Sequence, residues 1–147
     1  ITNILNIPTD VIKLLDDINA VEYDAPMNIV AAGYAPKRNY VTLQLLMYNS
    51  SQLNYNHNFF LAYNPEKKGA YEDMYGSTDG DAKSYLWLEL YHDAGVDTTM
   101  TEMEQTYFSV KLDPEVVDVD NLTNLKGIKI IYRDLDTRKP KIYTLNF

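Results

Sequence analysis

The sequence contains no cysteine among its 147 residues. That absence excludes disulfide bonds, thiolate nucleophiles and cysteine-ligated zinc centres. Histidine is scarce as well, because the chain has only His57 and His92. No spacing such as His-x-x-x-His relates them, so the sequence predicts no histidine metal site and assigns each residue to the end of a strand.

Sequence motifs of catalysis are missing too. The chain has no Gly-x-Ser-x-Gly elbow, no phosphate-binding glycine loop and no dinucleotide-binding fingerprint. Glycoside hydrolysis needs two carboxylates across a cleft, and Glu89 is the only acid set within an aromatic strand pattern. Because no second acid is identifiable, we expect no enzymatic activity and keep a hydrolase that uses Glu89 as an alternative.

Positive charge is in deficit over the whole chain. Thirteen lysines and arginines against 21 acids give a formal charge of −8 and a pI near 4.6. Nucleic acids and anionic membranes recruit cationic surfaces, so neither is an expected partner. No apolar run approaches the roughly 18 residues of a membrane span, so membrane insertion is not expected.

One end of the chain departs from this acidity. We interpret the basic stretch as solvated strand faces and a turn rather than as an anion site. Residues 126–147 contain Lys126, Lys129, Arg133, Arg138, Lys139 and Lys141 against Asp134 and Asp136.

The clearest element is a strand over residues 84–92, whose side chains alternate between two unlike faces. One face is leucine-rich and is predicted to be core. The opposite face has the only tryptophan of the protein at its centre. The leucine face consists of Leu86, Leu88 and Leu90, and the aromatic face consists of Tyr85, Trp87, Glu89 and Tyr91.

The aromatic face is the predicted ligand-binding surface. Rings spaced about 7 Å apart along a strand suit stacking on sugar rings or an aromatic-anchored protein contact. A long connection over residues 64–83 supplies two further candidates, Tyr71 and Tyr75. The alternative is that another part of the chain covers the rings, and then they belong to the core.

Period-two alternation also predicts strands at residues 40–48, 57–63, 106–112, 127–135 and 141–147, with a weaker one at 27–32. The polar residues 49–56 predict a hairpin between the first two. Residues 9–20 are predicted to form the one helix, with Thr9 as N-cap. Its apolar stripe, a candidate cover for the Trp87 face, is formed by Val11, Leu14, Leu15 and Ile18.

These elements predict a mainly β, single domain over residues 1–147. The expected fold is an antiparallel β-sandwich, Ig-like or jelly-roll-like, with one short N-terminal α-helix and a β core over residues 40–147. Residues 1–7 are expected to form an arm or an edge strand. The alternative is an α+β fold, in which a helix packs on one curved antiparallel sheet.

Calcium is the one cofactor alternative, because Asp79, Asp81, Asp93 and Asp97 lie in predicted loops or at a strand end. Calcium takes about six to eight oxygen ligands, which acidic loops can supply together with carbonyls. None of these segments matches the EF-hand pattern. Solvated acidic turns are therefore favoured, and we predict no cofactor.

By elimination, the sequence predicts a non-catalytic binding module that is secreted or displayed on the cell surface. Its expected target is carbohydrate or protein, recognised through the aromatic strand face and the long loops. The alternative is a structural subunit of a surface or virion-type assembly. In that case residues 1–7 or 142–147 would complete the sheet edge of a neighbouring subunit.

Overall fold

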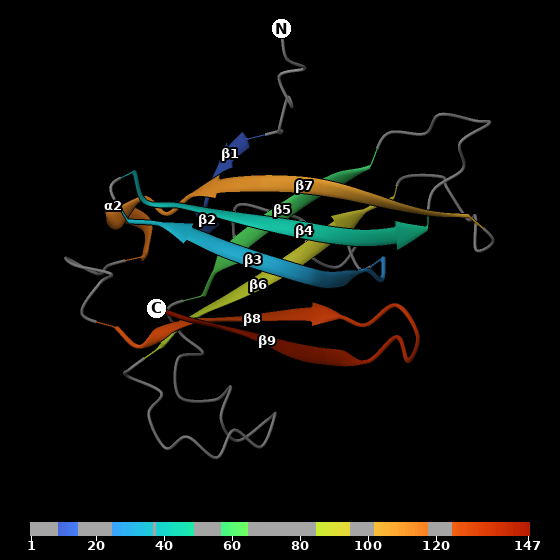
Figure 1. Ribbon diagram of the computed structural model, residues 1–147. Coiled ribbons are helices and arrows are strands. Elements are labelled where there is room, and N and C mark those ends of the chain that lie inside the picture. Colours follow the sequence, from blue (N-terminus) through green and yellow to red (C-terminus); the bar gives the residue numbers. More distant parts are fainter. Residues whose placement is uncertain are drawn as a thin grey trace, which may run out of the picture.

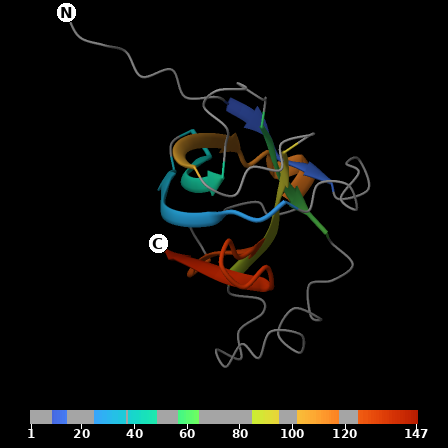
Figure 2. The same cartoon turned by 90° about the vertical axis from the view of Figure 1, so that its right-hand side faces the viewer.

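The computed structural model describes residues 9–14, 25–36, 38–48, 57–64, 85–94, 102–117 and 125–147, and all structural statements concern these residues. Two β-sheets pack on each other as a sandwich (Figure 1). Figure 2 shows β3, β4 and β7 grouped on one side and β5 and β6 on the other. The predicted β-sandwich is therefore confirmed.

The first sheet has the strand order β1-β7-β4-β3 and the second the order β2-β5-β6-β8-β9. The strands of the first sheet are β1 (Thr9–Val11), β7 (Met103–Lys111), β4 (Tyr40–Tyr48) and β3 (Asn28–Ala35). The strands of the second are β2 (Lys13–Leu14), β5 (Asn58–Tyr63), β6 (Tyr85–Asp93), β8 (Gly127–Arg133) and β9 (Pro140–Asn146).

Both sheets are mixed, which corrects the expectation of purely antiparallel sheets. β1 runs parallel to β7, β2 parallel to β5 and β6 parallel to β8. After β6 the chain enters the first sheet as β7 and then returns to the second as β8. This excursion is the crossover that parallel neighbours require.

The predicted helix over residues 9–20 is wrong for its first half, because residues 9–11 and 13–14 are β1 and β2. Ile12 lies between these two strands and is buried, whereas Val11 is exposed. A helix this short is marginal without docking, and the two strands instead pair with β7 and β5. Residues 15–20 lie outside the described ranges. Within these ranges the only helix is the single turn α2 (Pro114–Val117).

The core lies between the two sheets. Burial alternates strictly along β4, as predicted, and the leucine face of β6 is core as well. The core residues of the central strands are Val41, Leu43, Leu45, Met47, Leu86, Leu88, Leu90, Phe108, Val110, Ile128 and Ile130.

The predicted hairpin of residues 40–48 and 57–63 is wrong. β4 pairs with β3 and β7, whereas β5 pairs with β2 and β6 in the other sheet. The chain changes from the first sheet to the second between β4 and β5. A polar connection of this length does not specify which of the two sheets the next strand joins. In contrast, the closing hairpin of β8 and β9 forms as predicted.

Candidate functional site

The predicted aromatic face lies on the outer side of the second sheet, away from the main core. Trp87 is only 3% exposed. It forms a small second hydrophobic cluster with Ile131 of β8, and Tyr85 and Ile142 pack against this cluster. Because stacking on a sugar requires an accessible ring face, Trp87 offers no open platform in this structure.

A lysine completes this cluster. Lys129 lies opposite Trp87 in the parallel pairing of β6 and β8 and is itself only 6% exposed. Its Nζ lies 4.8 Å from the ring centroid of Tyr85 and 5.4 Å from that of Trp87. Such contacts partly replace the water that a buried ammonium loses. The Tyr85 hydroxyl donates to Asn146 Oδ1 at 3.0 Å, which ties β6 to β9 across β8.

The remaining predicted residues are not brought into one site. Glu89 Oε2 is buried, and the described part of the chain provides it with no hydrogen-bond partner. Tyr91 and Asp93 are half-buried at the end of β6. The other candidates, Tyr71, Tyr75, Asp79, Asp81 and Asp97, lie outside the described residues, so their roles stay predictions. Among described residues, no group of three or more potential metal-ligating side chains occurs.

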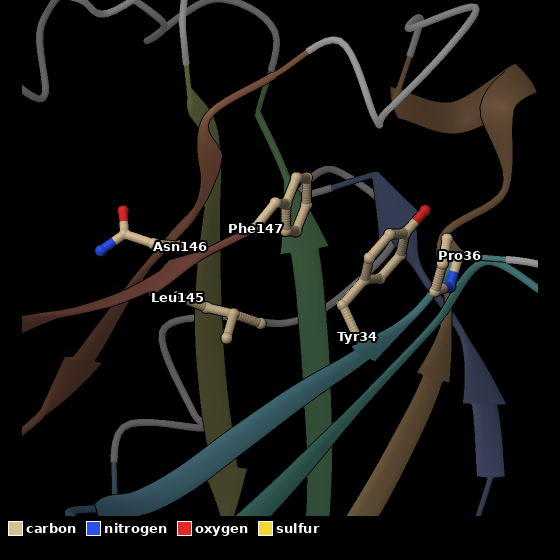
Figure 3. A pocket seen from close by; sticks show the side chains of 5 residues that line it. All are labelled: Tyr34, Pro36, Leu145, Asn146 and Phe147. Atoms are coloured by element: carbon tan, nitrogen blue, oxygen red, sulfur yellow. The ribbon is translucent and has the colours of Figure 1, made fainter.

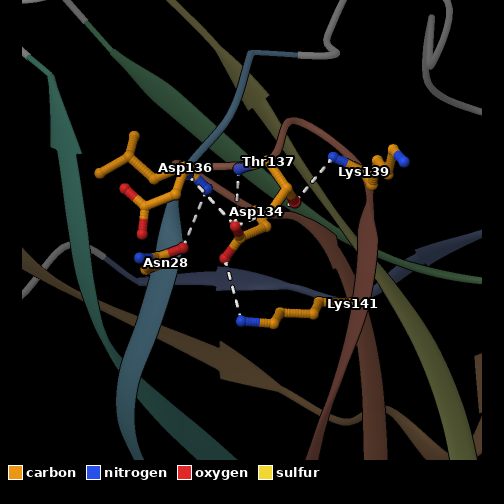
Figure 4. Close-up of polar contacts among 7 residues, drawn as sticks. Asn28, Asp134, Asp136, Thr137, Lys139 and Lys141 are labelled. Atoms are coloured by element: carbon orange, nitrogen blue, oxygen red, sulfur yellow. Dashed lines mark hydrogen bonds and ion pairs between the residues drawn. The ribbon is translucent and has the colours of Figure 1, made fainter.

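A polar network of several hydrogen bonds lies in the turn between β8 and β9 (Figure 4). Asp134 is 2% exposed and accepts hydrogen bonds from the backbone N–H of Asp136 and from both the N–H and the hydroxyl of Thr137. Lys141 Nζ lies 3.4 Å from its other oxygen. The hydrogen bonds from Thr137 lower the pKa of Asp134. This carboxylate holds the turn together and is not a candidate catalyst.

A pocket that the sequence does not predict lies between β3 and β9 (Figure 3). It has a volume of about 330 Å³, the size of the smaller ligand pockets. Its lining is mostly apolar and comes from both sheets. The lining residues are Tyr34, Pro36, Leu145, Asn146 and Phe147.

Two stacked rings define this pocket. The ring centroids of Tyr34 and Phe147 lie 4.8 Å apart with an interplanar angle of 23°. The Tyr34 hydroxyl donates to Asn39 Oδ1 at 2.8 Å, and burial raises the pKa of Tyr34. Asn39 has a φ of 56° in the turn after β3, a left-handed conformation that asparagine tolerates. The turn therefore fixes one ring, whereas the other belongs to the half-exposed Phe147.

The pocket lies at the open side of the sandwich. β3 and β9 are the terminal strands of their sheets in the described chain, so each presents one side of its backbone away from its sheet. Terminal strands are ready templates for pairing with another extended segment. β3 carries an irregularity between Ile29 and Ala31, and β9 begins with Pro140. Both features limit such pairing to part of each strand.

Neither a protein-family model nor a curated protein sequence matches this chain. Solved structures of similar fold include a NigD-like immunity protein from Bacteroides caccae, with a TM-score of 0.63 and 20% identity over 97% of this chain. Another is a protein of unknown function, DUF1344, from Bacteroides vulgatus, with a TM-score of 0.58 and 19% identity over 96% of this chain. The chain spans 61% and 57% of the lengths of these two proteins. At this identity the likeness establishes the shared β-rich fold alone.

Proposed function

We propose that this domain is a non-catalytic binding module that recognises an extended segment of a partner protein at the seam between β3 and β9. The observation that carries the proposal is the apolar pocket between two terminal strands. Strand addition provides affinity through backbone hydrogen bonds, and an adjacent pocket provides selectivity for a side chain. A volume of about 330 Å³ accommodates one large apolar side chain.

The charges around the seam indicate the chemistry of this segment. Arg38 and Lys126 are exposed, and their backbones bond to Ala35 of β3 and to Phe147, respectively. Arg138 and Lys139 are exposed at the far end of β9, beside the exposed Asp136, whereas Lys141 there is paired with Asp134. The protein is acidic as a whole, so this basic rim stands out, and complementary charge favours an acidic partner segment. We therefore propose an apolar anchor with acidic flanks.

One observation disfavours carbohydrate as the target, and one structural neighbour favours binding over catalysis. Trp87, the ring best suited to sugar stacking, is 3% exposed. One structural neighbour is a NigD-like immunity protein, and an immunity role would require recognition of another molecule, which favours binding over catalysis.

No helix in the described ranges is long and apolar enough to cross a bilayer. A secreted or cell-surface location stays a prediction from composition.

The test is a titration of the isotope-labelled protein with two blocked pentapeptides, followed by NMR. One peptide has phenylalanine between acidic residues, and the other has alanine in its place. We expect the phenylalanine peptide alone to shift the amide signals of Tyr34, Leu145 and Phe147. Phe147→Ala should weaken binding at least about 10-fold, because one wall of the pocket is lost.

Val30→Ala is the matched control, because Val30 is 46% exposed on β3 but does not line the pocket. This variant should bind as tightly as the wild-type protein. Equal binding of the two peptides, or shifts confined to Tyr85 and Tyr91 on the outer face, would refute the seam as the site.

A second copy of this chain is the alternative occupant of the seam, as in an assembly subunit. Residues 142–147 are not a spare donor strand, however, because β9 is paired with β8 in its own sheet. Sedimentation across a wide concentration range separates the two cases. Concentration-dependent dimers that Phe147→Ala abolishes would favour assembly over a foreign partner.

A further inference from the structure

The two histidines of the chain meet at one end of the second sheet. Nδ1 of His57 lies 2.6 Å from Nε2 of His92. His92 shares the core-facing side of β6 with Leu88 and Leu90. The antiparallel register places Phe59 opposite His92, so His57, two residues before Phe59, extends the same face of β5. His92 is 2% exposed and His57 is half-buried, so the pair is accessible from the His57 side.

The surroundings of His92 determine which nitrogen carries its hydrogen. Nδ1 of His92 lies 3.2 Å from the carbonyl oxygen of Pro26. A carbonyl only accepts, so Nδ1 of the neutral ring is the donor there and Nε2 directs its lone pair at His57. His57 therefore donates through its own Nδ1 in the neutral pair.

Packing orients the buried His92 ring. Phe59 stacks on His92 with centroids 4.7 Å apart and an interplanar angle of 21°. The His57 and His92 centroids are 4.9 Å apart. A backbone carbonyl that accepts from the second ring nitrogen is the usual outer support of a metal-ligating histidine.

We propose that His57 Nδ1 and His92 Nε2 form a binding site for a divalent transition-metal ion with imidazole affinity, such as Zn²⁺. The ion takes the place of the hydrogen between the rings. The hydrogen of His57 moves from Nδ1 to Nε2, so the neutral pair binds without net proton release. The half-buried His57 ring shifts so that the two nitrogens separate to about 3.4 Å, because zinc–nitrogen bonds are about 2.0–2.1 Å in a tetrahedral site.

The described residues bring no third ligand into the group, so the proposal counts two protein ligands, and water is able to occupy remaining coordination positions. We therefore expect weaker binding than at a closed four-ligand zinc site. The ion would strengthen a junction of several segments. Ala25 N–H donates to the His92 carbonyl, and Met27 N–H donates to the Arg133 carbonyl, so residues 25–27 join β6 and β8 to the start of β3.

Calorimetric titration of the full chain with zinc chloride at neutral pH tests the proposal. We expect one ion per chain and a rise in Tm of about 5–10 °C at a 100-fold excess over Kd. His57→Gln should weaken binding at least 10-fold, because the chain has no cysteine and no third histidine to replace this ligand. Asp93→Asn is the control for binding by the neighbouring carboxylate and should leave the affinity unchanged.

Two results would overturn the proposal. One is the absence of zinc binding at about millimolar concentration, where even weak imidazole sites fill. The other is equal binding by the wild-type protein and His57→Gln. In the wild-type protein itself, the imidazole carbon-bound proton signals of both histidines must shift together on saturation, and unshifted signals refute the site without recourse to a variant.

Discussion

Two buried side chains lie on the outer face of the second sheet. Trp87 and Lys129 are an aromatic and a charged neighbour on adjacent strands, and both are almost completely buried. A buried ammonium is costly unless nearby groups offset the lost hydration. The contacts of Lys129 with the Tyr85 and Trp87 rings supply part of that compensation, so this cluster contributes to stability as well as to shape.

We expect Trp87→Ala to destabilise the fold by about 3–5 kcal/mol, the usual cost of deleting a buried large aromatic side chain. Trp87→Phe keeps most of the volume and should cost less, about 1–2 kcal/mol. Urea unfolding followed by circular dichroism measures both. Trp87 is the only tryptophan, so it accounts for all tryptophan emission of the protein. Because the ring is buried, iodide should quench this emission only weakly. Wild-type stability of Trp87→Ala would show that the ring is not part of the core.

Asp134→Asn should lower the free energy of unfolding by about 1–3 kcal/mol at neutral pH, because it weakens three hydrogen bonds to a buried carboxylate. The hydrogen bonds from Thr137 depress the folded-state pKa. The stabilisation is therefore complete above the carboxyl's unfolded pKa, near 3.9, and is lost as the pH falls through the lower folded value.

The difference in the free energy of unfolding between the wild-type protein and Asp134→Asn should consequently become smaller below about pH 4. Urea unfolding at several pH values between about 2 and 7 measures this trend. Asp136→Asn is the control, since Asp136 is exposed and contributes its backbone N–H rather than its carboxylate to the network. A pH-independent difference would assign the effect to packing instead.

At the scale of elements, alternation predicts the strands that have one face on the core. β4 and β6 are of this kind, and their buried faces are the predicted ones. Residues 9–14 are different, because strands of three and two residues are too short to show period two. Their apolar spacing coincides with a helical stripe, and pairing with β7 and β5 overrides it.

Local sequence patterns do not predict which strands pair or which distant residues come into contact. The passage from β4 to the other sheet follows from packing of whole layers. The stacked pair of Tyr34 and Phe147 joins residues near opposite ends of the chain, so no local pattern indicates the pocket. The two histidines are correctly placed at strand ends, but their contact depends on the register of β5 and β6.

Gly127→Ala tests how closely β8 and β9 approach. A Cβ at Gly127 would collide with the backbone carbonyl oxygen of Leu145 on β9, and a backbone atom cannot move aside cheaply. We expect destabilisation of about 3 kcal/mol or more by thermal or urea unfolding.

Gly33→Ala is the matched control for this variant. Gly33 lies in β3, and a Cβ there meets nothing within 4 Å. It should change stability by no more than about 0.5 kcal/mol. Equal effects of the two substitutions would point to general glycine entropy rather than to the contact with Leu145.

For the whole molecule, most stabilising contacts join distant parts of the sequence. β4 pairs with β7, and β6 pairs with β8, each across an intervening segment. Such topologies fold slowly, because loop closure must precede the contacts that offset its entropy. We expect refolding to take about milliseconds to seconds. Stopped-flow fluorescence of Trp87 measures this rate. Microsecond refolding would contradict this account.

The crossing of residues 9–14 from one sheet to the other also bears on synthesis at the ribosome. β1 pairs with β7, so the first described strand emerges about 5–20 s before its partner at ordinary elongation rates. During that interval β4 and β5 leave the ribosome before their partners β7 and β6 are available to pair with them. The nascent chain therefore cannot acquire its native layers progressively from the N-terminus, and completion of both sheets waits for the C-terminal half.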